Sequence, residues 1–392
     1  MKRICVLLPG KIIYDNRVIK TINVLNKYCF VDLYYTYSTP IDNDLFNSNT
    51  KLFACPPQNT IKQKILKHSF FIYEYNYIYN EVKKHNKVYD YIWANDLPVL
   101  KLAFKIKKKT NGKIIYDSHE IYCETINQFF PENAKGIKKL VFKGLISMMR
   151  FIGNRAEANM LKKTDFFVTV CHSVKEYFTK KYGRKDIHVV YNCPPLSNNT
   201  DKIDFKKILG ISNNTFILLY QGVMNQGRAL NQMIEAHQFT DEDIRFILMG
   251  NGSIKNHLIS KTKSLGLEKK IIFIDPVHPS ELLKYTRGAD AGIVFQETDK
   301  NLSKKLGIAN KFFEYMHAGI PFVATEAPEN IHIVNQFPVC IFVNSKHDVL
   351  QIAQQINKLK NEPVKHMKEA ALKAAKYYNW DKQAEVIKEI VK

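Results

Sequence analysis

The chain has 392 residues, of which 45% are hydrophobic and 24% are charged, and this composition is typical of a folded globular protein. Because one core rarely serves so long a chain, we expect two domains of somewhat under 200 residues each. No apolar run approaches the roughly 18 residues of a membrane span, and the opening MKRICVLLPG is too short for a secretory signal, so we expect a cytosolic protein.

The formal net charge of +21 is concentrated in the first half of the chain. Residues 1–200 contain 32 Lys and Arg against 16 Asp and Glu, an excess of 16, and the remaining residues have an excess of only 5. This asymmetry indicates a polyanionic partner, either nucleic acid or an anionic membrane surface, or serves solubility alone. The seven cysteines are scattered without a C-x-x-C pair, so we expect a reducing compartment and no metal site.

In the first half, short apolar runs alternate with helical patterns. The runs are RICVLLPG (3–10), FVDLYYTY (30–37), YDYIWAND (89–96), KIIYDSHE (113–120) and TDFFVTVCHS (164–173), with helical patterns at 17–28 and 100–109. Strand and helix in turn predict a parallel sheet covered on both faces. The first run ends at Gly10, and Asp15 and Arg17 follow it as a possible ion pair.

The run 113–120 places His119 between Asp117 and Glu120 at the carboxyl end of a strand. A lone His is usually structural, but one beside two acids at this edge of a sheet is a candidate functional residue.

Two other stretches of the first half are ambiguous, and the first of them is rich in tyrosine. Tyr73, Tyr75, Tyr77 and Tyr79 alternate within 70–80, where we predict a helix with either aromatic packing or a binding platform.

The stretch from Lys135 to Lys163 mixes Lys and Arg with Leu, Ile, Met and Phe at helical spacing. The basic residues are Lys135, Lys138, Lys139, Lys143, Arg150 and Arg155. The pattern fits a helix lying on an anionic membrane, and it fits a solvated helix packed on the core equally well.

The polar stretch LSNNTDKID (196–204) lacks periodicity and is the best linker candidate. After it the alternation restarts, with apolar runs at 215–222, 244–253, 270–277, 290–297 and 321–325 and helical patterns between them. We therefore predict two Rossmann-like doubly wound α/β domains that face one another across a cleft, 1–196 and 197–375, followed by a helix over 376–392.

Glycines gather where strands of the second domain end. Gly222 and Gly227 follow one strand, Arg228 opens the next predicted helix, and Gly250 follows the next strand. Glycine lets a backbone approach a phosphate closely, and a helix N-terminus beside an arginine supplies positive charge. Each signal alone is weak, because glycine after a parallel strand is common, but the repetition favours a phosphate site.

The stretch NKFFEYMHAGIPFVAT (310–325) predicts a helix, a tight turn at Gly319 and a buried strand that follows Pro321. Glu314 lies in the first turns of that helix, where a carboxylate is stabilised and can accept hydrogen bonds from a ligand.

Taken together, YDSHE, VVYNCPP, the Gly-x-x-x-x-Gly-Arg turn, MGNGS and NKFFEYMHAGIPFVAT resemble the family 4 retaining glycosyltransferases of the GT-B fold. The resemblance covers nearly the whole chain in order and is strongest over 300–325. It implies a nucleotide-sugar donor on the second domain, an acceptor on the first, no cofactor and no metal, and a C-terminal helix that crosses back to the first domain.

The resemblance also implies roles for single residues. Glu314, together with Asn310, matches the group that binds the donor ribose, and Arg228 matches a cation on the donor diphosphate. Gly222, Gly227 and Gly250 match the donor loops, Gly10 matches the glycine loop near the diphosphate, and His119 matches a histidine that contacts the donor sugar.

Two positions depart from the family pattern. Leu306 stands where many members carry a first Glu, and Val223 stands where many carry a second Arg. Lys311, Lys304 or Lys305 can supply the missing cation, and Lys311 is our choice.

The resemblance therefore implies a metal-independent hexosyl- or N-acetylhexosaminyl-transferase that acts with retention, and we expect it to act at the cytoplasmic membrane face. The expected donor is a UDP-sugar, and the expected acceptor is a glycan or a lipid-linked intermediate of bacterial surface polysaccharide or glycoconjugate synthesis. A nucleotide-sugar epimerase on the same architecture is the alternative. A nucleic-acid-binding protein is a weaker one, because no RNP, zinc or helix-turn-helix signature is present.

Overall fold

The computed structural model describes residues 1–37, 45–56, 75–130, 135–299, 301–344, 346 and 348–392. Contacts divide the chain into two compact units, which we call unit 1 (Met1–Asn192 with Gln383–Lys392) and unit 2 (Cys193–Lys382). The domain boundaries expected from the sequence, at 196/197 and 375/376, stay predictions.

Unit 1 is built on a sheet with the strand order β3-β2-β1-β4-β5-β6-β7, in which all neighbouring strands are parallel. Its strands are β1 (Lys2–Leu8), β2 (Cys29–Thr36), β3 (Thr50–Cys55), β4 (Tyr91–Asn95), β5 (Lys113–Ser118), β6 (Phe166–Thr169) and β7 (Ile187–Val189). Its helices are η1 (Ile12–Tyr14), α1 (Asn16–Leu25), α3 (Asn76–His85), α4 (Leu97–Thr110), η3 (Tyr122–Glu124), η4 (Ile126–Phe129), α5 (Gly136–Leu161) and α6 (His172–Tyr182).

Unit 2 has a second sheet with the order β10-β9-β8-β11-β12-β13, again with parallel neighbours. Its strands are β8 (Phe216–Gln221), β9 (Ile244–Met249), β10 (Ile271–Ile274), β11 (Ala291–Val294), β12 (Phe322–Thr325) and β13 (Cys340–Val343). Its helices are α7 (Phe205–Leu209), α8 (Leu230–Ala236), α9 (Lys255–Ser264), α10 (Leu282–Arg287), α11 (Leu302–Leu306), α12 (Asn310–Ala318), α13 (Pro328–Val334), α14 (Val349–Asn361) and α15 (Lys365–Tyr377), and α16 (Trp380–Val391) ends the chain.

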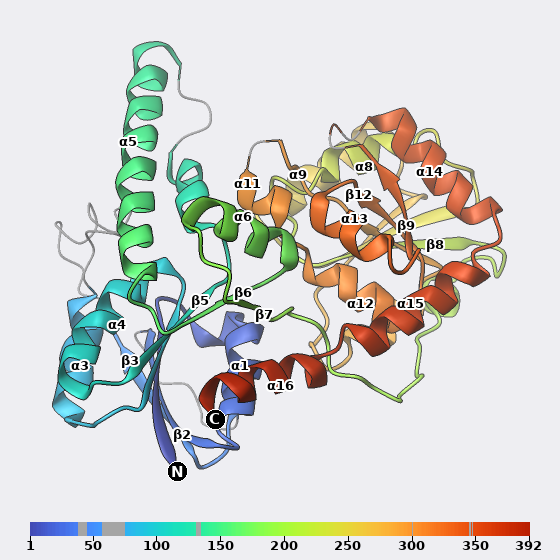
Figure 1. The fold of residues 1–392 in the computed structure, drawn as a ribbon. Coiled ribbons are helices and arrows are strands. Elements are labelled where there is room, and N and C mark those ends of the chain that lie inside the picture. The colour runs from blue at the N-terminus through green and yellow to red at the C-terminus, as the bar shows by residue number, and fades with distance from the viewer. Residues whose placement is uncertain (38–44, 57–74, 131–134, 300, 345, 347) are drawn as a thin grey trace. The chain divides into compact units, whose positions relative to one another are not determined.

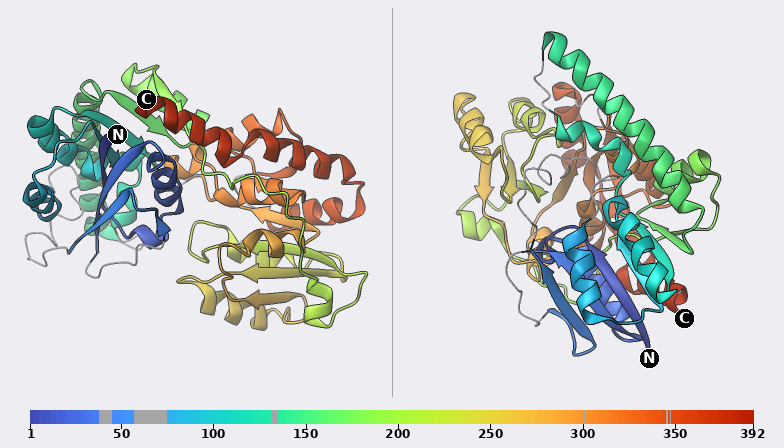
Figure 2. Two further views of the ribbon diagram at one scale, coloured as in Figure 1. Left: turned by 90° about the horizontal axis from the view of Figure 1, so that it is seen from below. Right: turned by 90° about the vertical axis from the view of Figure 1, so that its left-hand side faces the viewer.

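Helices cover both faces of each sheet (Figures 1 and 2). The central strands read as continuous apolar runs for this reason: in β8, the residues from Ile217 to Gln221 are all buried. Each sheet starts at a central strand, β1 or β8. The chain adds the next two strands on one side of it and the following strands on the other side, which is the doubly wound arrangement. The predicted fold class, two doubly wound α/β units, is confirmed.

The tyrosine-rich stretch is helical from Asn76 onward, and the part of it before Tyr75, Tyr73 included, lies outside the described residues. Tyr77 is buried, and its hydroxyl lies 2.9 Å from Thr36 Oγ1 of β2. At this tyrosine the structure supports aromatic packing against the sheet rather than a binding platform.

The chain ends with two helices, because α15 stops at Tyr377 and α16 begins at Trp380. Residues from Gln383 onward belong to unit 1, where Ile387 and Ile390 are buried and Lys2 Nζ donates to Val391 O over 3.0 Å. Among the described residues, no helix combines the length and the apolar character that crossing a membrane requires.

Candidate functional site

The stretch predicted to form a helix, a turn and a strand does so in unit 2. Helix α12 ends at Ala318, Gly319 follows with φ 69° in the left-handed region that favours glycine, and β12 begins at Phe322. Tyr315 fixes the helix on the sheet, because its hydroxyl donates to Leu219 O over 2.9 Å. The side chains at the start of α12 are therefore held against the carboxyl end of β8.

Glu314 is positioned by the last residue of β8. Gln221 Nε2 donates to Glu314 Oε2 over 2.5 Å, and Gln221 Oε1 accepts from Thr286 Oγ1 of α10 over 2.8 Å. Because Gln221 is buried and bonded at both ends, it holds the carboxylate in one orientation. The sequence analysis missed Gln221 and Thr286. The signal for Gln221 was a polar residue that ends the apolar run FILLY.

Lys311, on the same helix, is a buried lysine whose amino group lacks a hydrogen-bond partner among the described residues. The residue is 6% exposed, and its Nζ makes no hydrogen bond within the described residues. Instead Nζ lies 3.6 Å from the centroid of the Tyr220 ring, a cation–π contact. Burial and the nearby charge of Arg228 place the pKa of Lys311 well below its usual range, against the opposing effect of Glu314.

Gly222 and Gly227 shape the loop after β8. Their φ angles are 118° and 82°, in the region that favours glycine, and a Cβ added at Gly222 would lie 3.6 Å from Lys311 Nζ. Arg228 follows, and Ala229 after it also has a positive φ of 49°. The prediction that Arg228 opens a helix is wrong: α8 begins at Leu230, because Ala229 in the left-handed region interrupts the helical backbone. Arg228 is a loop residue.

Gly250 supports this loop from the next strand. Its φ is 151°, and a Cβ there would clash with the carbonyl oxygen of Gly222. Met224 N donates to Asn251 O over 2.8 Å, so the two loops pack backbone to backbone. The structure thus gives Gly250 a packing reason that does not require a ligand.

The two positions that depart from the family pattern are also placed. Val223 is half exposed next to Gly222, and Leu306 ends α11. Lys304, on the same short helix, comes close to Gly227, since a Cβ there would clash with Lys304 Nζ. Asn310 is exposed as the first residue of α12. Unit 2 therefore brings two cations, Arg228 and Lys311, and the fixed carboxylate of Glu314 to the carboxyl end of β8, a set suited to an anion that also carries hydroxyl donors.

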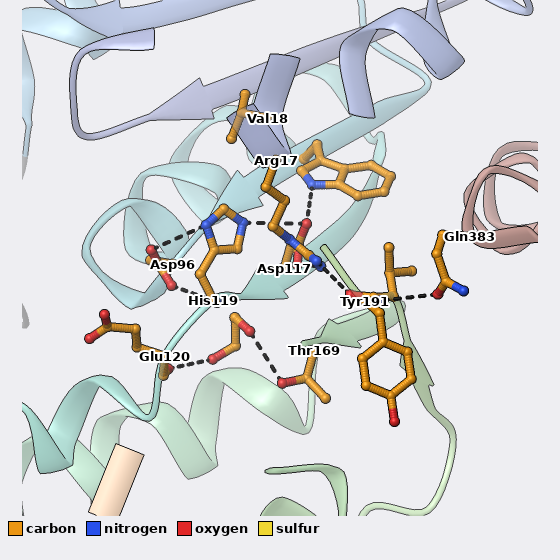
Figure 3. A network of polar contacts seen from close by, with 12 residues as sticks. Arg17, Val18, Asp96, Asp117, His119, Glu120, Thr169, Tyr191 and Gln383 are labelled. Carbon is orange, nitrogen blue, oxygen red and sulfur yellow. Dashed lines mark hydrogen bonds and ion pairs between the residues drawn. The ribbon is translucent and has the colours of Figure 1, made fainter. Parts of the chain in front are cut away.

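In unit 1, His119 follows β5 and lies among three carboxylates, of which Figure 3 shows Asp96 and Asp117. Its Nδ1 is 3.8 Å from Asp96 Oδ2 and 3.9 Å from Asp15 Oδ2, and its Nε2 is 3.5 Å from Asp117 Oδ2. These are ion-pair distances longer than good hydrogen bonds, and Nε2 has no hydrogen-bond partner among the described residues. The ring is thus held among these carboxylates mainly by charge.

Arg17 does not pair with Asp15, contrary to the possibility raised from the sequence. Arg17 Nη2 donates to Asp117 Oδ1 over 2.7 Å, and Nη1 donates to Val190 O over 2.5 Å (Figure 3). Asp15 instead caps α1, where its Oδ1 accepts from Val18 N over 3.0 Å. The reason is burial: a buried guanidinium needs a buried carboxylate, and Asp117 is buried whereas Asp15 is partly exposed.

Asp96 is a residue that the sequence analysis missed. It lies directly after β4 with φ 65° and ψ 163°, a strained backbone for a residue other than glycine. Asp96 N donates to Asp117 O and its Oδ1 accepts from His119 N, each over 2.8 Å, so the strained conformation turns its carboxylate toward His119. The only sequence signal was an acid at the end of the apolar run YIWAN.

The carboxylates decide the charge of His119. Burial lowers the pKa of His119, but Asp96 and Asp117 outweigh it and raise that pKa to about 9. Burial raises the pKa of Asp96 to about 6 in spite of His119, whereas Arg17 and His119 overcome burial and hold the pKa of Asp117 below its usual range. At neutral pH the imidazolium of His119 therefore lies beside the ionised carboxylates of Asp96 and Asp117.

Gly10 lies just after β1, and no packing explains it. A Cβ added there would meet no described atom within 4 Å, and its φ lies outside the left-handed region. Gly10 and His119 thus belong to unit 1, and the other predicted site residues belong to unit 2.

Comparisons with known proteins agree with this arrangement. Residues 201–377 match the family model described as glycosyl transferases group 1. A D-inositol 3-phosphate glycosyltransferase of Corynebacterium diphtheriae is 26% identical over 210 residues, which are 50% of this chain and 46% of that protein. The chain spans about half the length of the curated relatives it matches.

Solved structures resemble the whole chain. Anabaena HepE in complex with UDP and glucose has a TM-score of 0.72 at 15% identity and covers 100% of this chain and 99% of its own. Sucrose-phosphate synthase from Thermosynechococcus elongatus has a TM-score of 0.74 at 14% identity, with 100% and 98% covered. These likenesses show the GT-B fold. The family model and the named relatives favour a glycosyltransferase over the epimerase alternative.

Proposed function

We propose that this GT-B protein, whose residues 201–377 match the group 1 glycosyl transferases, is a retaining glycosyltransferase that uses a nucleotide-sugar donor. The observation that carries the proposal is the buried amino group of Lys311 beside Gly222, which has no hydrogen-bond partner among the described residues. A buried amino group without a partner costs folding free energy whether it keeps or gives up its proton, so its retention is best explained by an anionic ligand that completes the site. The diphosphate of a nucleotide-sugar is such an anion.

The residues of unit 2 then have separate roles. Glu314, fixed by Gln221, accepts hydrogen bonds from the ribose hydroxyls of the donor. Arg228 and Lys311 bind the diphosphate and stabilise the negative charge that grows on it as the glycosidic bond breaks. The helix start and the loops around the bound donor contain Asn310, Gly222, Gly227 and Gly250. The donor is a UDP-sugar in this proposal, in line with the UDP-bound neighbour.

Unit 1 supplies the sugar and acceptor side. His119, as an imidazolium, contacts the hydroxyl groups of the donor sugar, and Gly10 leaves room for the diphosphate. The acceptor is a glycan or a lipid-linked intermediate of surface polysaccharide or glycoconjugate synthesis. The net charge of +21 supports an anionic acceptor or an anionic surface that carries it.

The chemistry is a substitution at the anomeric carbon with retention. The acceptor oxygen forms a bond to this carbon while the bond from the carbon to the diphosphate oxygen breaks. The acceptor proton passes to the departing phosphate on the same face, so the protein needs no strong base of its own. Metal independence is part of the proposal on a separate ground, since Arg228 and Lys311 supply the positive charge at the diphosphate. The electron pair of the broken bond stays on the diphosphate, where Arg228 and Lys311 stabilise it.

The experiment is thermal stabilisation and calorimetry with UDP-, GDP- and CMP-sugars, since a ligand that binds the native state raises its apparent stability. We expect one nucleotide class to stabilise the protein and to lose its effect in Lys311→Met. Glu326→Gln, an exposed charge change in the same unit, is the matched control and keeps the effect. Stabilisation by no nucleotide, or equal stabilisation of Lys311→Met, would overturn the proposal.

A further inference from the structure

Two buried side-chain oxygens at one edge of the sheet of unit 2 lack hydrogen-bond donors. They are Gln296 Oε1, two residues after β11, and Asn330 Oδ1 of α13, and neither has a hydrogen-bond partner among the described residues. Asn330 is completely buried, and its Nδ2 donates to Thr325 O over 2.9 Å, so the oxygen of this amide is the unpartnered atom. A buried acceptor without a donor costs folding free energy and is uncommon in folded proteins. Retention of both oxygens therefore requires a source of donors that the described residues do not provide.

Thr325, the last residue of β12, connects the two residues. Its Oγ1 accepts from Gln296 N over 3.0 Å, and its carbonyl oxygen accepts from the side chain of Asn330. The strands β11 and β12 are parallel neighbours, with Val294 opposite Ala324, so both strands end at the same edge of the sheet. The backbone of Gln296 and the amide nitrogen of Asn330 are thus fixed to one residue at this edge.

The same edge of the sheet continues into the candidate donor site. In the sheet, β11 lies between β12 and β8, and β8 is the strand whose last residue orients Glu314. The residue after Gln296 is Glu297, whose N–H donates to Gly227 O over 3.1 Å. Because Gly227 directly precedes Arg228, the segment that carries Gln296 is fixed to the loop that carries this cation.

The unpartnered oxygens and the cations of unit 2 suit different parts of a ligand. Arg228 and Lys311 offer positive charge to an anion, whereas the amide oxygens of Gln296 and Asn330 are neutral acceptors that match O–H or N–H donors. An ionised diphosphate carries no such donor, so these acceptors fit a neutral, hydroxyl-bearing part of the ligand next to its charged part. A nucleotide-sugar has two such parts, the ribose and the transferred sugar. Since the ribose is assigned to Glu314, the transferred sugar remains.

We propose that Gln296 is a specificity-determining residue of the donor site, whose Oε1 accepts a hydrogen bond from a hydroxyl group of the transferred sugar. Thr325 positions it by binding its backbone N–H, and Asn330 in turn holds the carbonyl of Thr325. An acceptor of this kind discriminates against a sugar that lacks or inverts the hydroxyl group, because the amide oxygen is then left without a donor. The inference rests on the proposed function, since it requires a nucleotide-sugar donor, and it adds the residue that reads the sugar.

The first test is titration calorimetry with UDP and with UDP-linked glucose, galactose, N-acetylglucosamine and N-acetylgalactosamine. The quantity compared is the affinity for each UDP-sugar divided by the affinity for UDP, because this ratio removes effects on the nucleotide itself. For the preferred sugar, Gln296→Met should lower the ratio about two- to tenfold, the range for one lost hydrogen bond, and should leave UDP affinity unchanged. Gln296→Glu retains an acceptor oxygen and should retain most of the ratio. Gln238→Met makes the same change at an exposed glutamine of unit 2 and is the matched control.

The second test uses analogues of the preferred UDP-sugar that lack one sugar hydroxyl group each. Wild type should lose affinity for the analogue without the bound hydroxyl, whereas Gln296→Met should bind this analogue and the parent UDP-sugar equally well. Thr325→Val, which replaces the hydroxyl that accepts from Gln296 N, should lower the ratio for the parent sugar by less than Gln296→Met does.

The outcomes separate this inference from the proposed function. An unchanged ratio in Gln296→Met, or a loss that is the same for every deoxy analogue, would overturn the inference and assign Gln296 to packing or to an ordered water. If wild type still binds UDP in that case, the proposed function stands. Binding of no nucleotide by wild type would overturn both.

Discussion

Lys311 Nζ lies 3.6 Å from the centroid of the Tyr220 ring, and no acceptor among the described residues forms a hydrogen bond with this Nζ. An aromatic face stabilises an ammonium by about 0.5–2 kcal/mol, which is less than burial of an unpaired charge costs. The contact therefore holds Lys311 in place without satisfying it.

Replacement of this lysine should move stability and binding in opposite directions. In Lys311→Met the buried amino group and the cost of its desolvation are gone, so the melting temperature without ligand should rise, by roughly 2–4 °C for each kcal/mol in a domain of this size. Nucleotide diphosphate binding should weaken about 10- to 100-fold, as expected for one lost charged hydrogen bond. Calorimetric scans and titrations measure both, and a variant that is less stable and binds normally would assign Lys311 to the core.

A cation restored elsewhere should rescue the variant. Val223 is half exposed next to Gly222, so an arginine side chain can be accommodated there. We expect Val223→Arg in the Lys311→Met background to recover part of the nucleotide affinity, because the diphosphate again meets a second cation. Val223→Gln in the same background is the control, and equal rescue by Gln would show that charge is not the cause.

Nucleotide binding should take up protons. The pKa of Lys311 lies well below its usual range in the free protein, and a diphosphate next to Nζ favours the charged ammonium and raises that pKa. Above the free-state pKa, binding therefore protonates the lysine, and affinity falls as pH rises. Titration calorimetry in buffers of different ionisation enthalpy measures this uptake, which Lys311→Met should abolish. Uptake that persists in the variant would point to another group.

Glu314→Gln should weaken nucleotide binding by about 1.5–3 kcal/mol without unfolding the protein, because a neutral amide accepts ribose hydrogen bonds less strongly than a carboxylate. Gln221→Leu should cause a smaller loss, since it leaves the carboxylate present but frees its orientation. Dideoxynucleotides, which lack both the 2′- and the 3′-hydroxyl, provide the check: they should bind wild type and Glu314→Gln with similar affinity. If Glu314→Gln weakens the binding of these ligands as much as the binding of ribonucleotides, Glu314 does not bind the ribose.

Arg228→Ala should lower turnover more than it lowers donor affinity, because the charge on the diphosphate grows as the bond to the sugar breaks. Arg228→Lys should keep part of the turnover. Single-turnover rates and nucleotide affinities measured side by side decide the matter, and equal loss in both would make Arg228 an anchor only.

His119 should titrate near pH 9 instead of near its usual 6.5. Because the pKa of His119 is raised in the folded state, protonation of His119 stabilises the fold. This contribution to the free energy of unfolding is fully present below about pH 6.5 and is lost as pH rises through about 9. The imidazole resonance that disappears in His119→Gln identifies the group by NMR. Asp96→Asn removes one carboxylate and should move that titration toward neutral pH, and no movement would leave Asp117 as the only partner that matters.

Periodicity predicted the fold, because a buried parallel strand needs only an apolar run followed by a turn. It also placed Glu314 and Lys311 on one helix, since the run from Phe312 to Gly319 carries helix and stop signals together. It did not find Gln221, Thr286 or Asp96. These residues act through contacts between segments distant in sequence, and the pairing of Arg17 with Asp117, 100 residues away, was missed for the same reason.

The division of the chain into units affects how it can be taken apart. Unit 2 is a continuous segment inserted between Asn192 and Gln383 of unit 1. A fragment that ends at Asn192 would lack Ile387 and Ile390, and it would expose the apolar surface that covers them. Tyr191 N donates to Gln383 Oε1 over 2.9 Å, so the two cut ends are neighbours. A short glycine-rich joint between Asn192 and Gln383 would therefore excise unit 2 and leave unit 1 with its own C-terminal helix turns.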